Sequence, residues 1–356
     1  MKNILFISNY PTRQQIADGM MRRIMAIDRI FSDYNRLYLN ISFRRNISEN
    51  HQQLSDRSKI ISLNYFLHKK VITQYIQNSD LIYVHSMYNM VKVLPFVSRS
   101  PSFLVLDVHG VVPEETLYMK YFLKYVVMQN YEKKAFKRAD VKIYVSESMR
   151  SYYQQKYNEY SERSIIYPIL PDTLKYIGRK IDETAFRREL SLKDDDIIFI
   201  YSGGTSKWQN VDLMLDEFSK LSNPRYKLVI LTKDIEMFEK KLSARGLQDR
   251  TIITFSSSEE IYKYYTIANY GFVLRDEHVL NMVSCPTKLT EYLAWNIIPI
   301  LKSKNIGDLP SWDVDYINID QLNENMLNIK SRKNRKVVDN LILRYSAEKL
   351  LTQLNL

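Results

Sequence analysis

The sequence predicts an α/β protein of two domains, because short apolar runs of strand length alternate with helical patterns along its 356 residues. A chain of this length with 45% hydrophobic residues can bury two cores. Near the middle, Pro168 and Pro171 interrupt the alternation. We therefore expect one domain over residues 1–168, a second over 169–332, and a C-terminal helix over 333–356.

Each expected strand is a short, mostly apolar run between polar or helical segments. In the first domain these runs cover residues 4–8, 37–42, 60–63, 81–85, 103–108, 142–146 and 165–169. In the second they cover 197–202, 227–232, 251–255, 270–274 and 298–301. Helices are expected at 114–139, at 211–221, and at 259–268, where Ser257 and Glu260 form a capping-box pattern. This order is typical of parallel sheets with helical crossovers.

The chain is basic, with a net charge of +11 and an isoelectric point near 9.3. This charge favours an anionic partner, or it reflects a genome that is rich in Lys, Asn, Ile and Tyr codons. Nucleic acid is not expected, since no zinc-finger spacing, RNP motif or basic arm is present. The helical stretch 117–138 interleaves tyrosines with lysines. It is either an amphipathic helix with a solvated lysine face or a contact with an anionic membrane.

Cys285 is the only cysteine, which excludes an internal disulfide framework and fits a reducing compartment. The apolar run 4–7 is too short for the core of a signal peptide, and no run approaches the length of a membrane span. We expect a cytoplasmic protein, with peripheral contact at the inner face of the cytoplasmic membrane as a further possibility.

The most informative segment lies at residues 275–296. An apolar strand feeds a polar loop, and the loop feeds a short helix with Pro286 at its start. Ligands bind at such carboxyl edges of parallel sheets, and a helix N-terminus attracts phosphate. Lys288 adds a full positive charge in the first turn, and Glu291 lies on the same helix face. The segment predicts a nucleotide-sugar site.

Residues 284–294, followed by Ile298-Pro299-Ile300, resemble the donor-site signature of retaining glycosyltransferases of family 4, of the bacterial polysaccharide type. The resemblance implies the GT-B fold, in which two Rossmann-like domains face a central cleft and a C-terminal helix crosses back to the first domain. In that family a Glu-x7-Glu pair holds the donor. Glu291 matches the second Glu, which contacts ribose, whereas Ser284 is expected in place of the first, which contacts the sugar.

The family activity implied is transfer of a sugar, with retention, from a nucleotide diphosphate sugar to a glycan or lipid-linked oligosaccharide acceptor. A UDP-sugar is favoured over a GDP-sugar, in bacterial surface polysaccharide synthesis. No cofactor or metal is expected, because no carboxylate pair is placed to hold one. The run Asp194-Asp195-Asp196 precedes a strand and is interpreted as a polar turn.

Other candidate residues lie in the loops that follow strands. Gly203 and Gly204 would let the backbone approach a phosphate that Lys207 neutralises. Arg275 and His278 lie in the donor-side loop and could supply the missing sugar contact. Lys207 and Lys288 are the expected stabilisers of the leaving diphosphate.

In the first domain, His109 follows the strand 103–108 and matches the cleft histidine of the family, near the transferred sugar. Gly19, after Asp18, matches part of a glycine pair that approaches donor and acceptor. Arg22 and Arg23 either bind an acceptor phosphate or are ordinary solvated arginines.

Two alternative functions remain open from the sequence. The first is a nucleotide-sugar epimerase on the same fold. The second is a non-catalytic glycan-binding partner subunit, motivated by Ser284 and by the absence of an arginine that the family carries near Gly203.

Overall fold

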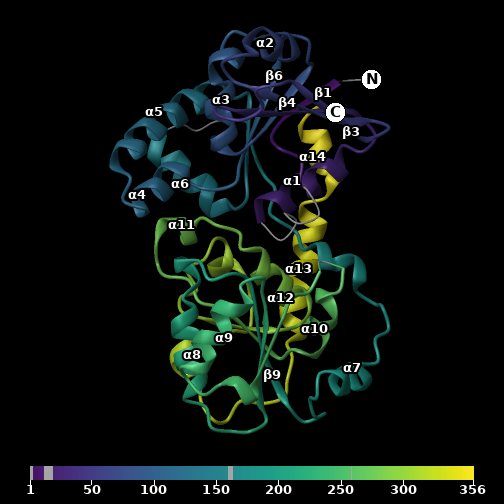
Figure 1. Cartoon of the computed structure of the whole chain (residues 1–356), viewed down its shortest axis with the longest axis vertical. Coiled ribbons are helices and arrows are strands. Elements are labelled where there is room, and N and C mark those ends of the chain that lie inside the picture. Colours follow the sequence, from purple (N-terminus) through teal and green to yellow (C-terminus); the bar gives the residue numbers. More distant parts are fainter. Residues whose placement is uncertain (1–2, 12–18, 159–162, 258) are drawn as a thin grey trace. The chain divides into compact units, whose positions relative to one another are not determined.

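The computed structural model describes residues 3–11, 19–158, 163–257 and 259–356 (Figure 1). The chain forms two compact units, and it passes from the first to the second between Pro168 and Ile169. Unit 1 comprises Met1–Pro168 and Tyr345–Leu356, and unit 2 comprises Ile169–Arg344. Each unit is described by itself below.

Unit 1 is built on a sheet whose described strands are ordered β3-β4-β2-β1-β5-β6-β7-β8. All neighbours are parallel except β3, which is antiparallel to β4. The strands are β1 (Asn3–Ile7), β2 (Asn35–Ser42), β3 (Asn50–Ser55), β4 (Ser58–Asn64), β5 (Leu81–His85), β6 (Phe103–Val108), β7 (Val141–Tyr144) and β8 (Ser164–Ile166). The helices are α1 (Gly19–Ile30), α2 (Lys69–Gln77), α3 (Ser86–Val97), α4 (Val112–Tyr118), α5 (Phe122–Arg138), α6 (Glu147–Tyr157) and α14 (Ala347–Gln353).

The first strand sits in the middle of this sheet, because β1 pairs with β2 on one side and with β5 on the other. Strand order therefore runs in opposite directions from β1, which creates a switch point beside the carboxyl ends of β1 and β5. The loops after β1, β2, β5 and β6 all leave from this same edge. Any ligand site of unit 1 is expected there.

Unit 2 is a second parallel sheet, ordered β11-β10-β9-β12-β13-β14. Its strands are β9 (Ile197–Ser202), β10 (Tyr226–Leu231), β11 (Thr251–Thr254), β12 (Tyr270–Val273), β13 (Ile298–Leu301) and β14 (Ile317–Asn318). Its α-helices are α7 (Glu183–Glu189), α8 (Val211–Ser219), α9 (Ile235–Ser243), α10 (Ile261–Ile267), α11 (Val279–Met282), α12 (Thr287–Ala294) and α13 (Arg332–Arg344). Short 3-10 helices are η1 (Asp172–Tyr176), η2 (Lys207–Gln209), η3 (Gln248–Arg250), η4 (Leu309–Ser311) and η5 (Ile319–Gln321). The switch point of unit 2 falls between β9 and β12.

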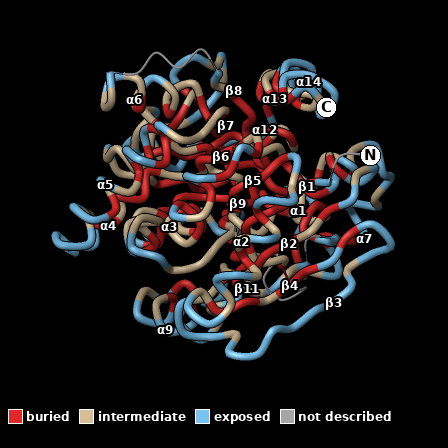
Figure 2. Tube along the Cα trace, turned by 90° about the horizontal axis from the view of Figure 1, so that it is seen from above, coloured by how far each residue is buried: buried red, intermediate tan, exposed pale blue. Residues whose placement is uncertain are grey.

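Buried apolar side chains from the strands and helices of each unit pack together into hydrophobic cores. Ile4, Phe6 and Tyr83 belong to the unit 1 core, which also takes in Leu350 of α14. Figure 2 shows β5 and β6 in the buried interior, whereas β3 runs exposed along the edge. In the described part of the chain, no helix is long and apolar enough to cross a membrane.

Several elements differ from the sequence-based expectation. The helix expected at 114–139 is two helices, α4 and α5, because Lys120 between them is left-handed with φ 64°. The helix expected at 333–356 is also two: α13 belongs to unit 2 and only α14 to unit 1. Strands β3 and β14 were not expected, because their residues are half-exposed or polar. Helix α10 begins at Ile261, with Glu260 rather than Ser257 at its N-cap.

Candidate active site

The carboxyl edge of the unit 2 sheet gathers the residues expected to bind a nucleotide sugar. Strand β9 ends at Ser202 and the chain turns at Gly203. Strand β12 ends at Val273 and is followed by Arg275, and α12 begins after an N-cap at Pro286. Because β9 and β12 are adjacent, their following loops meet at the switch point.

Lys288 is the central side chain of this edge. It is buried, and its Nζ donates a hydrogen bond to Oε1 of Gln209 at 2.9 Å. The same Nζ lies 4.1 Å from the ring centre of Tyr201. Burial lowers the pKa of Lys288 well below 10.5, and the positive charge of Arg275 lowers it further, while Glu291 acts in the opposite direction. A bound anion would remove this penalty by giving the ammonium group a counter-charge.

Arg275 is a second cation held at the same edge. Burial lowers its pKa from 12.5 to about 10. Its Nε is buried without a hydrogen-bond partner among the described residues, and its Nη1 reaches only the carbonyl oxygen of Trp208, at 3.4 Å. No described carboxylate lies within ion-pair distance of Arg275 or Lys288. A buried cation and a partly buried one without an ion-pair partner are costly unless an anion binds near them.

Gly203 is required by its position beside Lys288. Its φ of 150° lies in a region that other residues rarely adopt. A Cβ at Gly203 would also lie 3.0 Å from Nζ of Lys288. The next residue, Gly204, accepts a hydrogen bond from the hydroxyl of Tyr201 at 2.5 Å through its carbonyl oxygen. Because Gly203 has no side chain, no Cβ crowds the amine of Lys288 at this turn.

Glu291 lies one helical turn beyond Lys288 on α12. It is buried, 2% exposed, and its Oε2 accepts a hydrogen bond from the hydroxyl of Tyr265 at 2.9 Å. The carboxylate influences Lys288 electrostatically without pairing with it at ion-pair distance. Glu291 is thus placed both to steady the lysine charge and to accept hydrogen bonds from a ligand hydroxyl.

Tyr292 anchors this helix against the sheet. Its hydroxyl accepts a hydrogen bond from the backbone N–H of Ser202 at 3.0 Å. The ring packs so closely on β12 that a Cβ at Gly271 would lie 2.4 Å from it. Gly271 therefore permits α12 to approach the strand, which fixes Lys288 and Glu291 over the edge.

Ser284 and His278 have local structural contacts. Ser284 donates from Oγ to the carbonyl oxygen of Asn281 at 2.9 Å. His278 is the N-cap of α11, where its Nδ1 accepts from the backbone N–H of Leu280 at 3.3 Å. The expected register was also wrong by one residue: seven residues separate Glu291 from Val283, not from Ser284. Val283 is apolar and buried, so it offers no hydrogen bond to a sugar.

Lys207 is exposed at the start of η2, the short 3-10 helix that also contains Gln209. The structure thus connects η2 to Lys288 through the side chain of Gln209, a residue that was not among the expected site residues. Neither Gln209 nor Tyr201 belongs to a recognisable motif, so only the fold reveals their contact with Lys288.

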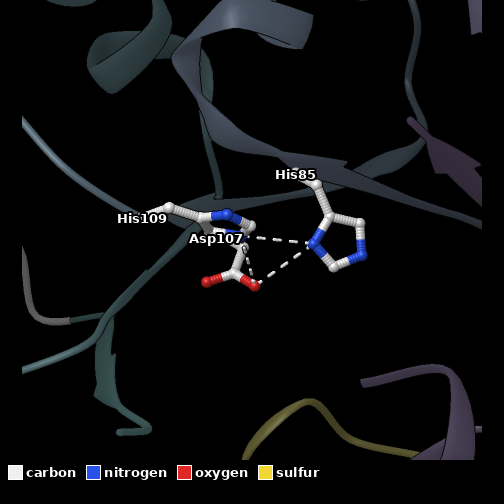
Figure 3. A group of neighbouring side chains, drawn as sticks. All are labelled: His85, Asp107 and His109. Atoms are coloured by element: carbon white, nitrogen blue, oxygen red, sulfur yellow. Dashed lines mark hydrogen bonds and ion pairs between the residues drawn. The ribbon is translucent and has the colours of Figure 1, made fainter. Parts of the chain in front are cut away.

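In unit 1, His109 lies at the carboxyl edge of β6 beside two other polar side chains (Figure 3). Its Nε2 is 3.1 Å from Oδ2 of Asp107 and 3.3 Å from Nδ1 of His85. Nδ1 of His85 is itself 3.4 Å from the same Oδ2. His109 is slightly exposed, whereas His85 and Asp107 are fully buried. The histidine expected at this edge is therefore held by a buried carboxylate.

Arg23 completes the cluster from helix α1. Its Nε and Nη2 donate to the two carboxylate oxygens of Asp107, at 3.1 and 3.0 Å. Nη1 donates to the carbonyl oxygens of Tyr167 and Pro168. The alternative of Arg23 as a solvated arginine or an acceptor-phosphate ligand is wrong, because its side chain is 1% exposed and already paired.

Burial and the neighbouring charges set the pKa values of Asp107 and His85 in this cluster. Burial opposes ionisation of Asp107, but Arg23 and His109 outweigh it and hold the pKa of the carboxyl well below its usual value. Burial lowers the pKa of His85 to about 4, so this histidine is neutral near pH 7. Tyr83 adds a further hydrogen bond, from its hydroxyl to Oδ2 of Asp107 at 2.9 Å.

The ligand atoms of His85, Asp107 and His109 all lie within 4.8 Å of one another, close enough to hold a metal ion. Imidazole and carboxylate are ordinary ligands for zinc and similar metals. However, both oxygens of Asp107 already accept from Arg23, whose positive charge opposes a nearby divalent cation. The donor set therefore fits a hydrogen-bonded cluster better than a metal centre.

Gly19 is exposed and opens α1. The preceding Asp18 lies outside the described residues.

Known proteins resemble this chain in one segment of sequence and in the whole fold. Residues 182–306, which include every site residue of unit 2 described above, match the family model described as glycosyl transferases group 1. Among proteins of curated function, none matches the sequence.

Solved structures of low sequence identity share the fold over the full chain. The Anabaena protein HepE in complex with UDP and glucose has a TM-score of 0.72 at 12% identity, covering 100% of this chain and 98% of HepE. Sucrose-phosphate synthase from Thermosynechococcus elongatus has a TM-score of 0.72 at 14% identity, with coverage of 100% and 98%. The UDP-forming alpha,alpha-trehalose-phosphate synthase from Burkholderia vietnamiensis has a TM-score of 0.65 at 11% identity, with coverage of 100% and 99%. The expected fold class, α/β with two Rossmann-like sheets of the GT-B type, is confirmed.

Proposed function

We propose that the protein is a retaining glycosyltransferase of family 4. It transfers a sugar from a nucleotide diphosphate sugar to a glycan or lipid-linked oligosaccharide acceptor in bacterial surface polysaccharide synthesis. One observation carries the proposal: the buried Lys288 and the partly buried Arg275 have no carboxylate partner in the described chain, at the sheet edge of a segment that matches glycosyl transferases group 1. Two uncompensated cations of this kind fit a diphosphate.

Each site residue has a chemical role in this proposal. Lys288 and Arg275, with Lys207, stabilise the negative charge that grows on the leaving diphosphate. Glu291 accepts hydrogen bonds from ribose hydroxyls. Gly203 and Gly204 let the diphosphate approach the backbone. His109 orients the transferred sugar, and Asp107 holds His109.

The remaining candidates have supporting roles. Gly19, which opens α1 of unit 1, is a further candidate for contact with the donor or the acceptor. His278, at the N-cap of α11, and Ser284, between α11 and α12, are further candidates for contact with a sugar hydroxyl.

The reaction exchanges one bond at the anomeric carbon. The bond to the diphosphate oxygen breaks, and the acceptor oxygen forms its bond on the same face of the sugar. The acceptor proton passes to the leaving diphosphate. The protein contributes mainly charge stabilisation, so neither a metal nor another cofactor is required.

A uridine nucleotide is favoured over a guanosine nucleotide as the donor. The support is indirect: HepE was solved with UDP and glucose, and the trehalose-phosphate synthase is named as UDP-forming. Incubation with UDP-glucose, UDP-galactose, UDP-N-acetylglucosamine and GDP-mannose tests this choice directly. Slow release of UDP, without release of GDP, is the expected result.

The same assay separates the alternatives. An epimerase would convert the donor sugar to its epimer before or without hydrolysis, which chromatography of the remaining donor detects. A non-catalytic partner subunit would release no nucleotide and would show no affinity for UDP. Retention is tested by the anomeric configuration of the first product, read by proton NMR.

Peripheral contact with an anionic membrane is also part of the proposal. Its support is a cluster of exposed apolar side chains at the corner between α4 and α5: Leu117, Met119, Tyr121, Phe122, Leu123, Val126 and Val127. Leu123 is 87% exposed, and the exposed Lys120 and Lys124 accompany the cluster. Such a combination of apolar and basic side chains suits a bilayer interface. Leu123→Glu should reduce co-sedimentation with vesicles that contain phosphatidylglycerol, and an unchanged bound fraction would contradict the contact.

A further inference from the structure

A cavity of about 500 Å³ opens at the carboxyl edge of the unit 1 sheet, and its described lining includes none of the site residues discussed so far. The loop after β2 supplies Arg44 and Arg45, and helix α3 supplies Lys92. Asn9, which follows β1, and Asn46 add amide groups to the wall. The lining thus contains three cationic side chains and several neutral hydrogen-bonding groups, but none of its described residues carries a carboxylate.

The loop that carries the arginines is held in one conformation. Oγ of Ser42 accepts hydrogen bonds from the backbone N–H groups of Arg44 and Arg45, at 3.2 and 2.9 Å. Asn46 takes a left-handed conformation with φ 61°, and its side chain donates to the carbonyl oxygen of Asn40 at 2.9 Å. Asn64, at the end of β4, donates to the carbonyl oxygen of Arg45 at 2.8 Å. The backbone beneath the arginines is therefore preorganised.

The positive charge of this cavity is not neutralised within the described chain. Nζ of Lys92 donates to Oδ1 of Asn89 at 2.9 Å, which is a neutral partner. Burial lowers the pKa of Lys92, so its charge is partly desolvated. Among the described residues, no carboxylate lies within ion-pair distance of Lys92, Arg44 or Arg45. An anion bound here would be stabilised by three charges at once.

The rim of the cavity is apolar. Phe43, Ile47, Phe66 and Leu67 are between 42% and 70% exposed, on the loops after β2 and β4. The ring of Phe43, which also lines the cavity, lies 4.9 Å from the ring of Tyr65. Tyr65 in turn lies 5.0 Å from Phe66. Phe43, Tyr65 and Phe66 therefore form a connected group of aromatic side chains on this rim.

We propose that this cavity binds an amphiphilic anion, a phosphate or pyrophosphate that carries a hydrocarbon chain, as the lipid-linked acceptor of the transfer reaction. Arg44, Arg45 and Lys92 hold the phosphate groups, and Phe43 and Phe66 contact the first part of the hydrocarbon chain. This inference rests on the proposed function, because it assigns the acceptor of the same reaction. Charge alone would suit any anion, and the apolar rim selects a lipid-borne one.

A second cavity in unit 1 provides the contrast. It has about 350 Å³ and lies at the opposite edge of the same sheet, near the start of β1, β2 and β4. It also contains basic residues, including Arg57 and Lys59, but Asp56 lines it with them. Lys59→Gln is therefore a matched control: it removes one exposed charge from β4 without touching the proposed site.

The experiment measures binding of three probes by calorimetry, each with saturating UDP present to block the diphosphate site of unit 2. The probes are farnesyl pyrophosphate, inorganic pyrophosphate and farnesol, below the concentration at which the lipids form micelles. The proteins are the parent, Lys92→Met, the pair Arg44→Gln/Arg45→Gln, Phe66→Ser, the control Lys59→Gln, and Leu123→Glu. The last variant removes the apolar corner of α4 and α5 as a competing lipid site.

Farnesyl pyrophosphate should bind the parent at least about tenfold more tightly than inorganic pyrophosphate, and farnesol should bind more weakly than either. Lys92→Met and the arginine pair should each weaken farnesyl pyrophosphate by about tenfold or more, because a charge-assisted contact is lost. Phe66→Ser should weaken farnesyl pyrophosphate but leave pyrophosphate unchanged. Lys59→Gln and Leu123→Glu should match the parent.

The inference would be overturned if farnesyl pyrophosphate bound the Lys92 and arginine variants as tightly as it binds the parent. It would also be overturned if farnesyl pyrophosphate did not bind the parent in the presence of saturating UDP. Equal affinity for farnesyl pyrophosphate and pyrophosphate would overturn the lipid part and leave a site for a soluble anion. The proposed function is judged separately. If UDP itself does not bind, the proposed function fails. If UDP binds but farnesyl pyrophosphate does not bind at the cavity, only this inference fails.

Discussion

Nζ of Lys288 lies 4.1 Å from the ring centre of Tyr201, with a neutral amide, that of Gln209, as its hydrogen-bond partner. The ring stabilises the ammonium group through its quadrupole, but it does not neutralise the charge. Lys288 is thereby held buried with no carboxylate partner in the described chain, where a bound anion would favour its charged form. This relationship links the fold of unit 2 to its proposed chemistry.

Removal of Lys288 should impair catalysis more than folding. Lys288→Ala should lower turnover at saturating donor by at least about tenfold, because loss of one electrostatic stabiliser commonly costs about 10²–10³ in rate. Lys207→Ala should act in the same direction if it faces the same diphosphate. The measurement is turnover of UDP-sugar hydrolysis beside the melting temperature. Lys304→Ala, an exposed lysine of the same unit, is the control. Parental turnover in Lys288→Ala would mean that the diphosphate site is placed wrongly.

Glu291 should contribute through ribose rather than through the diphosphate. Glu291→Gln keeps the size of the side chain but removes its charge, and it should weaken UDP and uridine by a similar factor, about tenfold to a hundredfold. Inorganic pyrophosphate lacks the ribose and should bind the variant much as it binds the parent. Calorimetry with the three ligands distinguishes the roles. If only pyrophosphate and UDP weaken, Glu291 acts by steadying Lys288 and not on ribose.

Much of the candidate site of unit 2 could be predicted because its residues are close in the sequence. Lys288 and Glu291 share one helix face, and the apolar run before them indicates the strand whose edge they occupy. The register error at Ser284 shows the limit of that approach, since a shift of one residue exchanges a polar side chain for the buried Val283. The partners Tyr201 and Gln209 could not be predicted, because nothing in their local sequence indicates contact with α12.

The cluster of unit 1 was predictable only in part. His109 was expected at the edge because it follows an apolar strand. Its partners Asp107 and His85 were not, since the pairing depends on β5 and β6 being adjacent. The burial of Arg23 was likewise unpredictable: its carboxylate partner lies 84 residues away, and a charged residue on a helix is ordinarily solvated.

Stability should fall in acid through His85. Its pKa is about 4 in the folded protein, below the ordinary value of 6.5, so the unfolded chain binds more protons between these two values. Stability is therefore lost as the pH falls from about 6.5 toward 4, with a slope of at most about 1.4 kcal/mol per pH unit from this group. Urea unfolding of the parent and of His85→Gln measures the difference, with exposed His51→Gln as the control. An identical pH dependence in parent and His85→Gln would contradict the buried neutral histidine.

Chelation should leave activity intact. In the proposed function, Lys288 and Arg275 take the place that a divalent metal would occupy beside a diphosphate, and the charge of Arg23 opposes a metal at the cluster of His85, Asp107 and His109. UDP-sugar turnover should therefore be the same within about twofold after treatment with EDTA. Loss of turnover that magnesium, manganese or zinc restores would contradict metal independence. In that case His85→Gln would show whether the unit 1 cluster holds the ion.

The central claim is that Lys288 and Arg275 of unit 2, which have no carboxylate partner in the described chain, bind the diphosphate of a nucleotide sugar. Calorimetric titration of UDP into the parent, Lys288→Met and Lys304→Ala tests it most directly. The account predicts one UDP per chain in the parent, unchanged affinity in Lys304→Ala, and affinity at least about tenfold weaker in folded Lys288→Met. No binding of UDP to the folded parent, or equal affinity in the parent and Lys288→Met, would contradict it.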